Sequence, residues 1–222
     1  MKTSLLFLII ILALISVYLL YDLIDLDRNN LKIFTSINIE NKRQNHIKII
    51  DLSKEVCPKE KYDSFNCVNL LEIYISPILC IHNKEIDITS QKISRDGIKE
   101  KNIIEFFLDH LLLNTESLFI DIGSHVGLYS MFAAKLGRDV VAVEAFSENI
   151  FRFHKAANLN NVIEKITLLN NAISDKKGLT TIILDDLIDV LPKQPNGKGY
   201  KKAVLKIDIE GYEPYAFLSA RK

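Results

Sequence analysis

Hydrophobic residues form one long stretch near the start of the chain. From Leu5 to Tyr21 only Ser16 interrupts an apolar run, and as a helix this run extends about 26 Å. A bilayer core is about 30 Å thick, so we predict a transmembrane signal anchor over residues 1–22. The alternatives are a cleaved signal peptide and a buried core helix.

The next part of the chain, residues 23–94, has no single sustained period. Up to about Lys61 it is polar and rich in asparagine, which is typical of a stem with only short β-leaning pieces. Leu70–Ile75 and Ile78–His82 then alternate or run apolar on either side of Pro77. We interpret this second part as two short accessory strands joined by a turn.

From residue 95 onward the pattern changes to alternating helices and strands. Apolar residues of Ile103–Leu113 fall on one helical face. The apolar stretches that follow predict strands over Leu118–Ile122, Val140–Val143, Ile166–Leu169 and Ala203–Ile207. Between them we expect helices over 126–136, closed by Gly137, and up to about Asn158 with Ser147 as N-cap. Right-handed crossovers make this an α/β domain with a parallel sheet, over residues 95–222.

Charge and cysteine content narrow the possible partners. The chain has 28 basic and 28 acidic residues, so no net field attracts nucleic acid, and we expect no nucleic-acid partner. Its three cysteines are Cys57, Cys67 and Cys80, without metal-ligand spacing, which gives no support to a zinc site. Cys57 and Cys67 either form a disulfide in an oxidising lumen or stay unlinked.

The first strand of this domain runs directly into a glycine loop. In Phe119–Gly127 the strand delivers Asp121 and Gly123 into a turn, and Gly127 opens the next helix. Gly123 permits close approach of a ligand to the backbone, and Gly127 lets the helix pack near the strand with its N–H groups facing the ligand. The loop is therefore a candidate cofactor site.

An acidic residue ends the second strand. Glu144 can accept hydrogen bonds from a ribose diol at this position, which indicates a cofactor that contains adenosine. The loop has the pattern D-x-G-x-x-x-G rather than the G-x-G-x-x-G that cradles a pyrophosphate. Asp121 repels a pyrophosphate but suits a cationic methionine moiety, so S-adenosylmethionine (SAM) is favoured. A nicotinamide-dependent oxidoreductase is the weaker interpretation.

Two further motifs give the sequence its resemblance to a known family. They are Asn171-Ala-Ile-Ser-Asp after the third strand and Lys206-Ile-Asp-Ile-Glu-Gly-Tyr-Glu after the fourth. With the glycine loop they resemble the FkbM family of methyltransferases, whose animal, membrane-anchored members are also similar at Cys80-Ile-His and Asp96-Gly-Ile. The resemblance covers about residues 78–220. It implies a class I, Rossmann-like methyltransferase fold and transfer of a methyl group from SAM, usually to an oxygen.

The same resemblance implies roles for individual residues. The cofactor-binding set is Asp121, Gly123, Gly127, Glu144, Ala145, Asn171 and Ala172. His125 and Ala145 stand where asparagine and proline are more usual, and neither change removes a required charge.

Asp208 and Glu210 match the acidic pair after the fourth strand and are the candidate bases that deprotonate an acceptor alcohol. The alternative role for such carboxylates is structural, at the start of the following helix. Asp208 is preferred because it ends a strand at the ligand-binding edge of the sheet. The acceptor is expected to be a hydroxyl of a sugar, a lipid or a small metabolite.

Compared with the family, the sequence is expected to be incomplete. It has only a few residues between Lys176-Lys177-Gly178 and Leu184-Asp185-Asp186-Leu187, and it stops soon after the fourth strand. This favours a C-terminally truncated domain, with Ala203–Ile207 as an exposed edge and weak or no turnover. The alternative function is a membrane-anchored SAM-fold protein that binds without catalysis.

Charged residues around the apolar run predict how the chain is oriented in a membrane. Lys2 precedes the run and Asp22, Asp25 and Asp27 follow it, which places the N-terminus in the cytoplasm. We therefore expect a single-pass type II membrane protein whose body is lumenal or extracellular, with an endomembrane such as the Golgi as one location.

Overall fold

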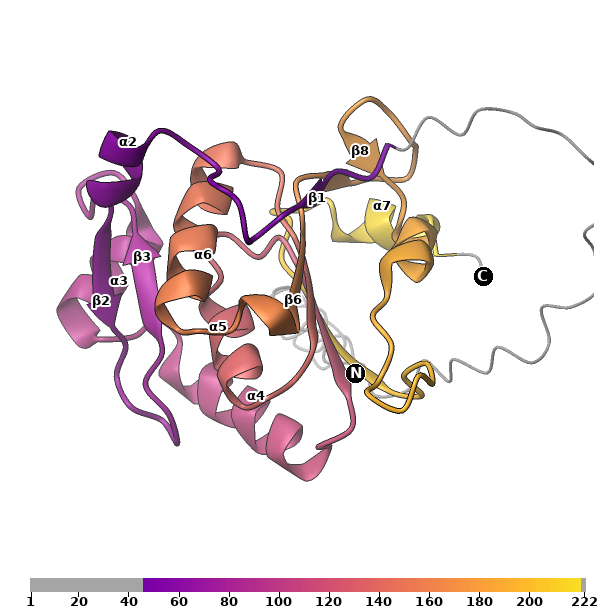
Figure 1. The fold of residues 1–222 in the computed structure, drawn as a ribbon, viewed down its shortest axis with the longest axis horizontal. Helices are drawn as coiled ribbons and strands as arrows, with labels where there is room; N and C mark the ends of the chain where they lie inside the picture. Colours follow the sequence, from indigo (N-terminus) through magenta and orange to yellow (C-terminus); the bar gives the residue numbers. More distant parts are fainter. Residues whose placement is uncertain (1–45, 221–222) are drawn as a thin grey trace, which may run out of the picture.

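A computed structural model of the protein describes residues 46–220. The predicted anchor over Leu5–Tyr21 lies outside these residues. Within residues 46–220, no helix is both long enough and apolar enough to cross a membrane. The described residues form a mixed α/β fold with a mostly parallel central sheet (Figure 1).

Strands and helices alternate through most of the described chain. The strands are β1 (Ile49–Ile50), β2 (Asn66–Asn69), β3 (Ile78–Ile81), β4 (Leu118–Ile122), β5 (Val140–Val143), β6 (Ile166–Leu169), β7 (Ala172–Ile173), β8 (Thr181–Ile182) and β9 (Ala203–Ile207). The α-helices are α2 (Lys59–Asp63), α3 (Ile88–Asp96), α4 (Lys101–Leu113), α5 (Leu128–Lys135), α6 (Ser147–Leu159) and α7 (Glu213–Leu218), and the 3-10 helices are η2 (Ile163–Lys165) and η3 (Leu184–Val190).

The central sheet has the strand order β1-β6-β5-β4-β9. Its four longer strands are parallel and have the bounds that the sequence predicts, while β1 pairs with β6 in the antiparallel direction. Parallel strands are covered on both faces, so they appear in a sequence as short continuous apolar runs. Within the described residues β9 is an edge strand, and all five of its residues are buried.

Successive residues of each strand contribute to two different cores. Phe119 packs in the core on the side of α4, α5 and α6, whereas Ile120 packs in the core that includes η3 and α7. Figure 1 shows α4, α5 and α6 together on one face of the sheet and α7 and β8 on the other. The two-residue period of a strand thus places helices on both faces.

The chain reverses direction across the sheet at β4. The connections from β4 to β5 and from β5 to β6 lead to one side of β4, and the next strand of this sheet, β9, lies on its other side. The strand that follows β4 in the chain therefore lies on one side of it, and the last strand of the sheet lies on the other side. Ligand sites of open α/β sheets lie at such switch points, beyond the carboxyl ends of the strands.

The predicted pair of accessory strands is only partly correct. Ile78–Ile81 is a strand, but its antiparallel partner is Asn66–Asn69 and not Leu70–Ile75. The register pairs Asn69 with Ile78, so the intervening residues form the connection of the hairpin. Leu70–Ile75 thus contains the turn, and Tyr74 within it has a left-handed backbone, with φ of 61°.

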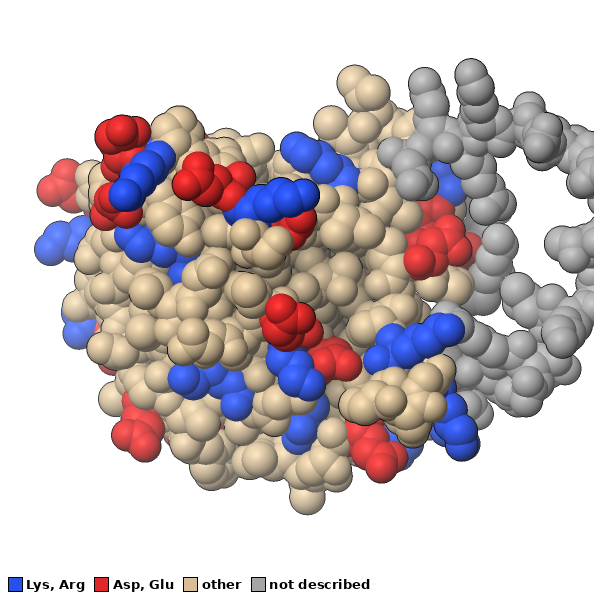
Figure 2. All heavy atoms as spheres, in the orientation of Figure 1, with Lys and Arg blue, Asp and Glu red and all other residues tan. Residues whose placement is uncertain are grey.

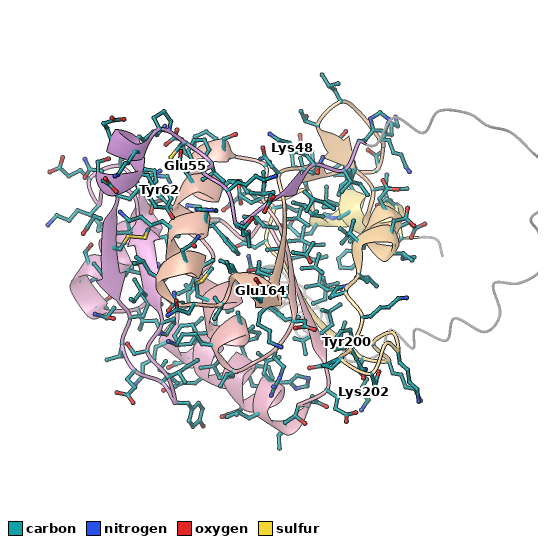
Figure 3. All side chains as sticks on the ribbon, in the orientation of Figure 1. Lys48, Glu55, Tyr62, Glu164, Tyr200 and Lys202 are labelled. Atoms are coloured by element: carbon teal, nitrogen blue, oxygen red, sulfur yellow. A yellow bond between two sulfur atoms is a disulfide. The ribbon has the colours of Figure 1, made fainter. Side chains whose placement is uncertain are left out.

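The cysteines also pair differently from either alternative considered for Cys57 and Cys67. A disulfide links Cys67 to Cys80 across β2 and β3, and Cys57 is a free thiol. Directly opposed cysteines on neighbouring strands are close enough to bond, which the spacing in the sequence does not reveal. Figure 3 shows the disulfide as a yellow bond beside α6.

Residues that precede the α/β domain contribute to the same hydrophobic core. Leu52 and Phe65 are buried together with residues of α4 and α5. The hydroxyl of Tyr62 lies 3.0 Å from Nδ1 of His154 on α6. Part of the segment predicted as a stem, from Ile49 onward, thus packs against the sheet and its helices.

One predicted helix cap is wrong. Ser147 is the first residue of α6 rather than its N-cap, and the residue at the N-cap is Phe146. The backbone N–H of Phe146 donates to the carboxylate of Glu144, at 2.8 Å. A carboxylate from the preceding strand therefore satisfies this end of the helix instead of a serine hydroxyl.

Basic and acidic side chains are mixed on the face shown in Figure 2. Neither sign forms a continuous stripe there. This distribution agrees with the equal numbers of basic and acidic residues in the sequence.

Candidate functional site

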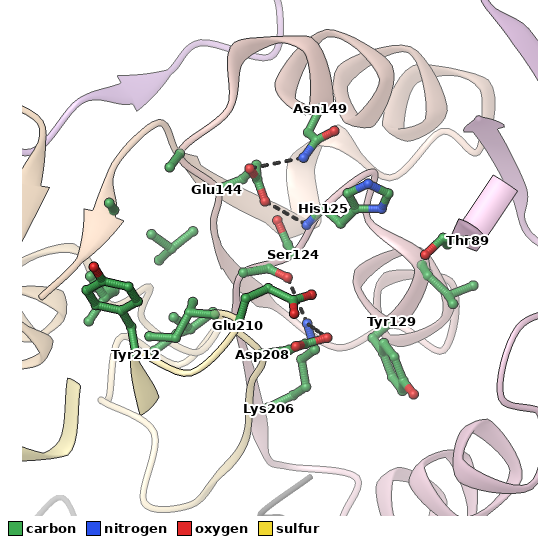
Figure 4. Close-up of a pocket in the computed structure, with 18 of the residues that line it drawn as sticks. Thr89, Ser124, His125, Tyr129, Glu144, Asn149, Lys206, Asp208, Glu210 and Tyr212 are labelled. Atoms are coloured by element: carbon green, nitrogen blue, oxygen red, sulfur yellow. Dashed lines mark hydrogen bonds and ion pairs between the residues drawn. The ribbon is translucent and has the colours of Figure 1, made fainter. Parts of the chain in front are cut away.

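A cavity of about 840 Å³ lies at the carboxyl ends of β4, β5 and β9 (Figure 4). Its position coincides with the switch point between β4 and β9. Figure 4 shows Thr89 of α3 and Tyr129 of α5 on one side of the cavity and Tyr212 on the opposite side. All of the predicted site residues line the cavity except Asp121 and Gly127.

Close packing within the protein explains both glycines of the loop, as was predicted for Gly127 but not for Gly123. Both have positive φ, +73° at Gly123 and +91° at Gly127. A Cβ on Gly123 would lie 1.8 Å from the carbonyl oxygen of Asp208, and one on Gly127 would lie 2.6 Å from the ring of Phe153. Contacts within the protein therefore exclude larger residues at both positions.

Asp121 is fully buried and contacts α5 through Ser130. The hydroxyl of Ser130 donates to its Oδ2 at 2.6 Å, and Nζ of Lys206 lies 3.2 Å from its Oδ1. The second contact is an ion pair without hydrogen-bond geometry. Asp121 thus balances the charge of Lys206 in the protein interior.

Lys206, on β9, connects the glycine loop to the cavity floor. Its ammonium donates to the carbonyl of Gly123 at 2.8 Å and lies 4.0 Å from a carboxylate oxygen of Asp208. The side chain is only 6% exposed, yet it lines the cavity. Lys206 begins the motif that follows the fourth predicted strand, but no role was predicted for it. Its position on a buried strand, two residues before an acidic residue, is the signal that could have identified it.

Glu144 is buried at the end of β5 and accepts three hydrogen bonds from the protein. Oε1 accepts from the backbone N–H of Phe146 at 2.8 Å and from the side-chain amide of Asn149 at 3.1 Å. Oε2 accepts from the backbone N–H of His125 at 2.8 Å. A carboxylate has about four acceptor sites, so one remains, on Oε2, and Glu144 is among the residues that line the cavity.

His125 sits in the glycine loop with a left-handed backbone, at φ of 52°. That conformation is uncommon for a residue with a side chain and is found most often at functional sites. Its Nε2 lies 3.6 Å from Oδ2 of Asp87, and its ring lies 5.5 Å from that of His82 between centroids. Burial lowers the pKa of the His125 imidazole, although Asp87 and Glu144 act in the opposite direction. The imidazole of His125 at the cavity wall is therefore neutral at pH 7.

The side chain of Asn171, one of the predicted cofactor-binding residues, makes hydrogen bonds that hold the fold. The side chain of Asn171 donates to the carbonyls of His46 and Thr180 and accepts from the N–H of Lys48. Ala172 and the exposed Ala145 present small side chains to the cavity. A ligand at this end therefore meets small apolar groups and backbone rather than the Asn171 amide.

Asp208 and Glu210 follow β9 and face the cavity from the same side (Figure 4). The side chain of Asp208 is 23% exposed. Glu210 is exposed and has a left-handed backbone, at φ of 56°. The structural role that was an alternative for these acids belongs instead to Glu213, whose carboxylate accepts from the N–H of Ile209 at 2.9 Å.

One buried hydroxyl at the cavity has no hydrogen-bond partner among residues 46–220. Ser124 is 3% exposed, and its Oγ is unsatisfied. Buried polar atoms in folded proteins are nearly always paired, so a polar ligand is one explanation of such an atom. Ser124 lies at a variable position of the glycine loop, and the sequence analysis missed it. The same cavity is lined by Thr89 and Tyr129, which were also missed.

No cluster of histidine, cysteine, aspartate and glutamate that could hold a metal ion occurs within residues 46–220. The cavity is lined by carboxylates, ammonium groups, one imidazole and hydroxyls.

Comparisons with known proteins give a distant likeness in fold. No family model matches the sequence, and no curated protein matches it. One solved structure that the chain resembles is a SAM-dependent methyltransferase from Agrobacterium tumefaciens, with 14% identity and a TM-score of 0.36. The match covers 48% of this chain and 32% of that protein, so it spans about a third of the latter's length. A likeness of this extent carries no argument about activity.

Proposed function

We propose that the chain is a SAM-dependent methyltransferase of the FkbM type. The observation that carries the proposal is the cavity at the switch point, which is lined by Glu144, a carboxylate with one acceptor site left on Oε2. A carboxylate at the end of the second parallel strand is the group that recognises a ribose in adenosine-binding folds. The resemblance of the motifs at Asp121, Asn171 and Lys206 to that family supports the same function.

The residues at the cavity fit an adenosyl cofactor. Glu144 would hold a ribose hydroxyl, the hydroxyl of Ser124 is available for a second polar contact, and Ala172 leaves space for a flat base. The volume of about 840 Å³ is in the range of small-molecule sites, which is about 300–1,000 Å³. When bound, SAM supplies an electrophilic methyl group.

Asp208 and Glu210 are proposed to act on the acceptor. Both carboxylates lie at the cavity end formed by β9, beside Lys206. Asp208 can accept the proton of a hydroxyl while the neighbouring ammonium, 4.0 Å away, keeps the carboxylate in place. Glu210 can hydrogen-bond the acceptor from the rim. The rest of the site contributes by orienting the reactants.

Methyl transfer from labelled SAM to a mixture of sugar, lipid and small-metabolite alcohols tests this proposal. We expect Asp208→Asn to reduce transfer by about a hundredfold, because the amide cannot accept the proton. Glu210→Gln should reduce it less. Asp175→Asn, an exposed residue outside the cavity, is the matched control. Unchanged transfer by Asp208→Asn would exclude it as the base, and SAM binding without transfer by the unaltered chain would favour the binding-only alternative.

Membrane anchoring is part of the same proposal. The apolar run Leu5–Tyr21 and the aspartates after it support a type II anchor with the body in a lumen or outside the cell. The disulfide between Cys67 and Cys80 supports an oxidising compartment for the body, because such bonds persist mainly there.

A further inference from the structure

His82 directly follows β3 and lies outside the cavity lining. Its Nε2 is 2.6 Å from the side-chain oxygen of Asn149. Asn149 is buried at the first turn of α6, and its amide nitrogen lies 3.1 Å from Oε1 of Glu144. A continuous chain of hydrogen bonds therefore connects His82 to the carboxylate proposed to recognise the ribose.

The chemistry of this chain assigns each donor and acceptor. A carboxylate only accepts hydrogen bonds, so the amide nitrogen of Asn149 must face Glu144. The amide oxygen of Asn149 then faces His82, and the Nε2–H of His82 must donate to it. Glu144 therefore sets the orientation of the Asn149 amide, and the Nε2–H of His82 holds the amide in that orientation. The reversed orientation would place the amide oxygen against the Glu144 carboxylate.

The position of His82 is itself fixed by neighbouring residues. Its backbone N–H donates to the hydroxyl of Ser90 at 2.9 Å, and the N–H of Ser90 donates to Asp87 at the start of α3. Two residues earlier, Cys80 is bonded to Cys67. The His82 ring also packs beside the His125 ring. These contacts leave the imidazole little freedom to move away from Asn149.

We infer that His82 is a positioning residue for the cofactor: through Asn149 it fixes the Glu144 carboxylate so that the remaining acceptor site of Oε2 faces the ribose. This inference rests on the proposed function. A ligand-binding side chain can rotate when it stands alone. Residues that hydrogen-bond to it without touching the ligand therefore fix its orientation. The motif Cys80-Ile-His, which carried part of the family resemblance without a role, thereby acquires one.

Calorimetric titration of S-adenosylhomocysteine and of its 2′,3′-dideoxy analogue into the full chain tests the inference. For His82→Ala we expect the affinity for S-adenosylhomocysteine to fall by about two- to tenfold, the effect of one neutral hydrogen bond. The affinity for the dideoxy analogue should not change, because that ligand lacks the hydroxyls that Glu144 would accept. His82→Gln, whose amide can donate to Asn149, should restore most of the loss.

Two further variants separate positioning from a general role in the fold. In an Asn149→Ala background, His82→Ala should have no additional effect, because the connection to Glu144 is already broken. His110→Ala, on α4 and outside the cavity lining, is the control. If His82→Ala does not fold, His82→Phe keeps a ring beside His125 while removing the Nε2–H, and it carries the same test.

The outcomes distinguish this inference from the function on which it rests. If the unaltered chain does not bind S-adenosylhomocysteine, the proposed function is contradicted and the role of His82 with it. If the chain binds, but His82→Ala weakens both ligands equally or adds to Asn149→Ala, the function stands and the positioning role is wrong.

Discussion

Replacement of Gly123 with alanine is expected to destabilise the protein by more than about 4 kcal/mol, in the range of the most damaging single substitutions. The added Cβ would lie 1.8 Å from the carbonyl oxygen of Asp208, which is a backbone atom, and the backbone also fixes the position of the Cβ, so neither atom can rotate away. Gly123 and Asp208 directly follow β4 and β9, so relief of the contact requires separation of two paired strands. Because small proteins are stable by only about 5–15 kcal/mol, a large fraction of this variant should be unfolded.

Gly137→Ala is the matched control for this prediction. Gly137 also has positive φ, +81°, but a Cβ there would meet no atom within 4 Å. It should therefore cost only the conformational strain, about 1–2 kcal/mol. Urea denaturation of both variants measures the difference. Equal destabilisation by the two substitutions would mean that the close approach of Asp208 to Gly123 is not a feature of the folded protein.

Lys206→Met is expected to cost about 3–5 kcal/mol, because it leaves the carboxylate of Asp121 buried without a compensating charge. Asp121 is fully buried, and Lys206 is its only cationic neighbour among the ion pairs of the described residues. The substitution also removes the donor to the Gly123 carbonyl. Methionine keeps a similar length of chain, so the loss of packing should be small.

The double variant Lys206→Met with Asp121→Asn identifies the cause. Asparagine is neutral and can still accept from Ser130, so the double variant should be more stable than Lys206→Met alone. Thermal or denaturant unfolding of the two single variants and the double variant gives the free energies of unfolding for a double-mutant cycle. Strict additivity would show that the two side chains do not compensate each other's charge.

The parallel strands could be predicted to the residue because burial on both faces leaves a direct pattern in the sequence. Val140–Val143 and Ala203–Ile207 are short apolar runs bounded by polar residues, and a strand has few other places to begin or end. The glycine loop and Glu144 could be placed for the same reason, since each follows such a strand. The hairpin of β2 and β3 was harder to predict, because Leu70–Ile75 has a strand-like composition but forms part of the connection between the two strands.

Contacts between distant parts of the chain could not be predicted. Lys206 neutralises Asp121, and His82 reaches Asn149, through pairings that only the folded sheet brings together. The exclusion of a side chain at Gly123 also depends on such a contact, with the backbone that follows β9. Local patterns therefore located the cavity, whereas the partners of its charged groups required the tertiary structure.

We propose that the cavity beyond β4, β5 and β9 binds an adenosyl cofactor through Glu144. The most direct test of this proposal is a calorimetric comparison of S-adenosylmethionine, its 2′- and 3′-deoxy analogues, and a nicotinamide dinucleotide, each titrated into the unaltered chain. We expect S-adenosylmethionine to bind, and removal of the hydroxyl that faces Glu144 to weaken binding by about 1.5–3 kcal/mol, the value of a hydrogen bond to a charged group. Tighter binding of the dinucleotide, or equal binding of all the deoxy analogues, would contradict it.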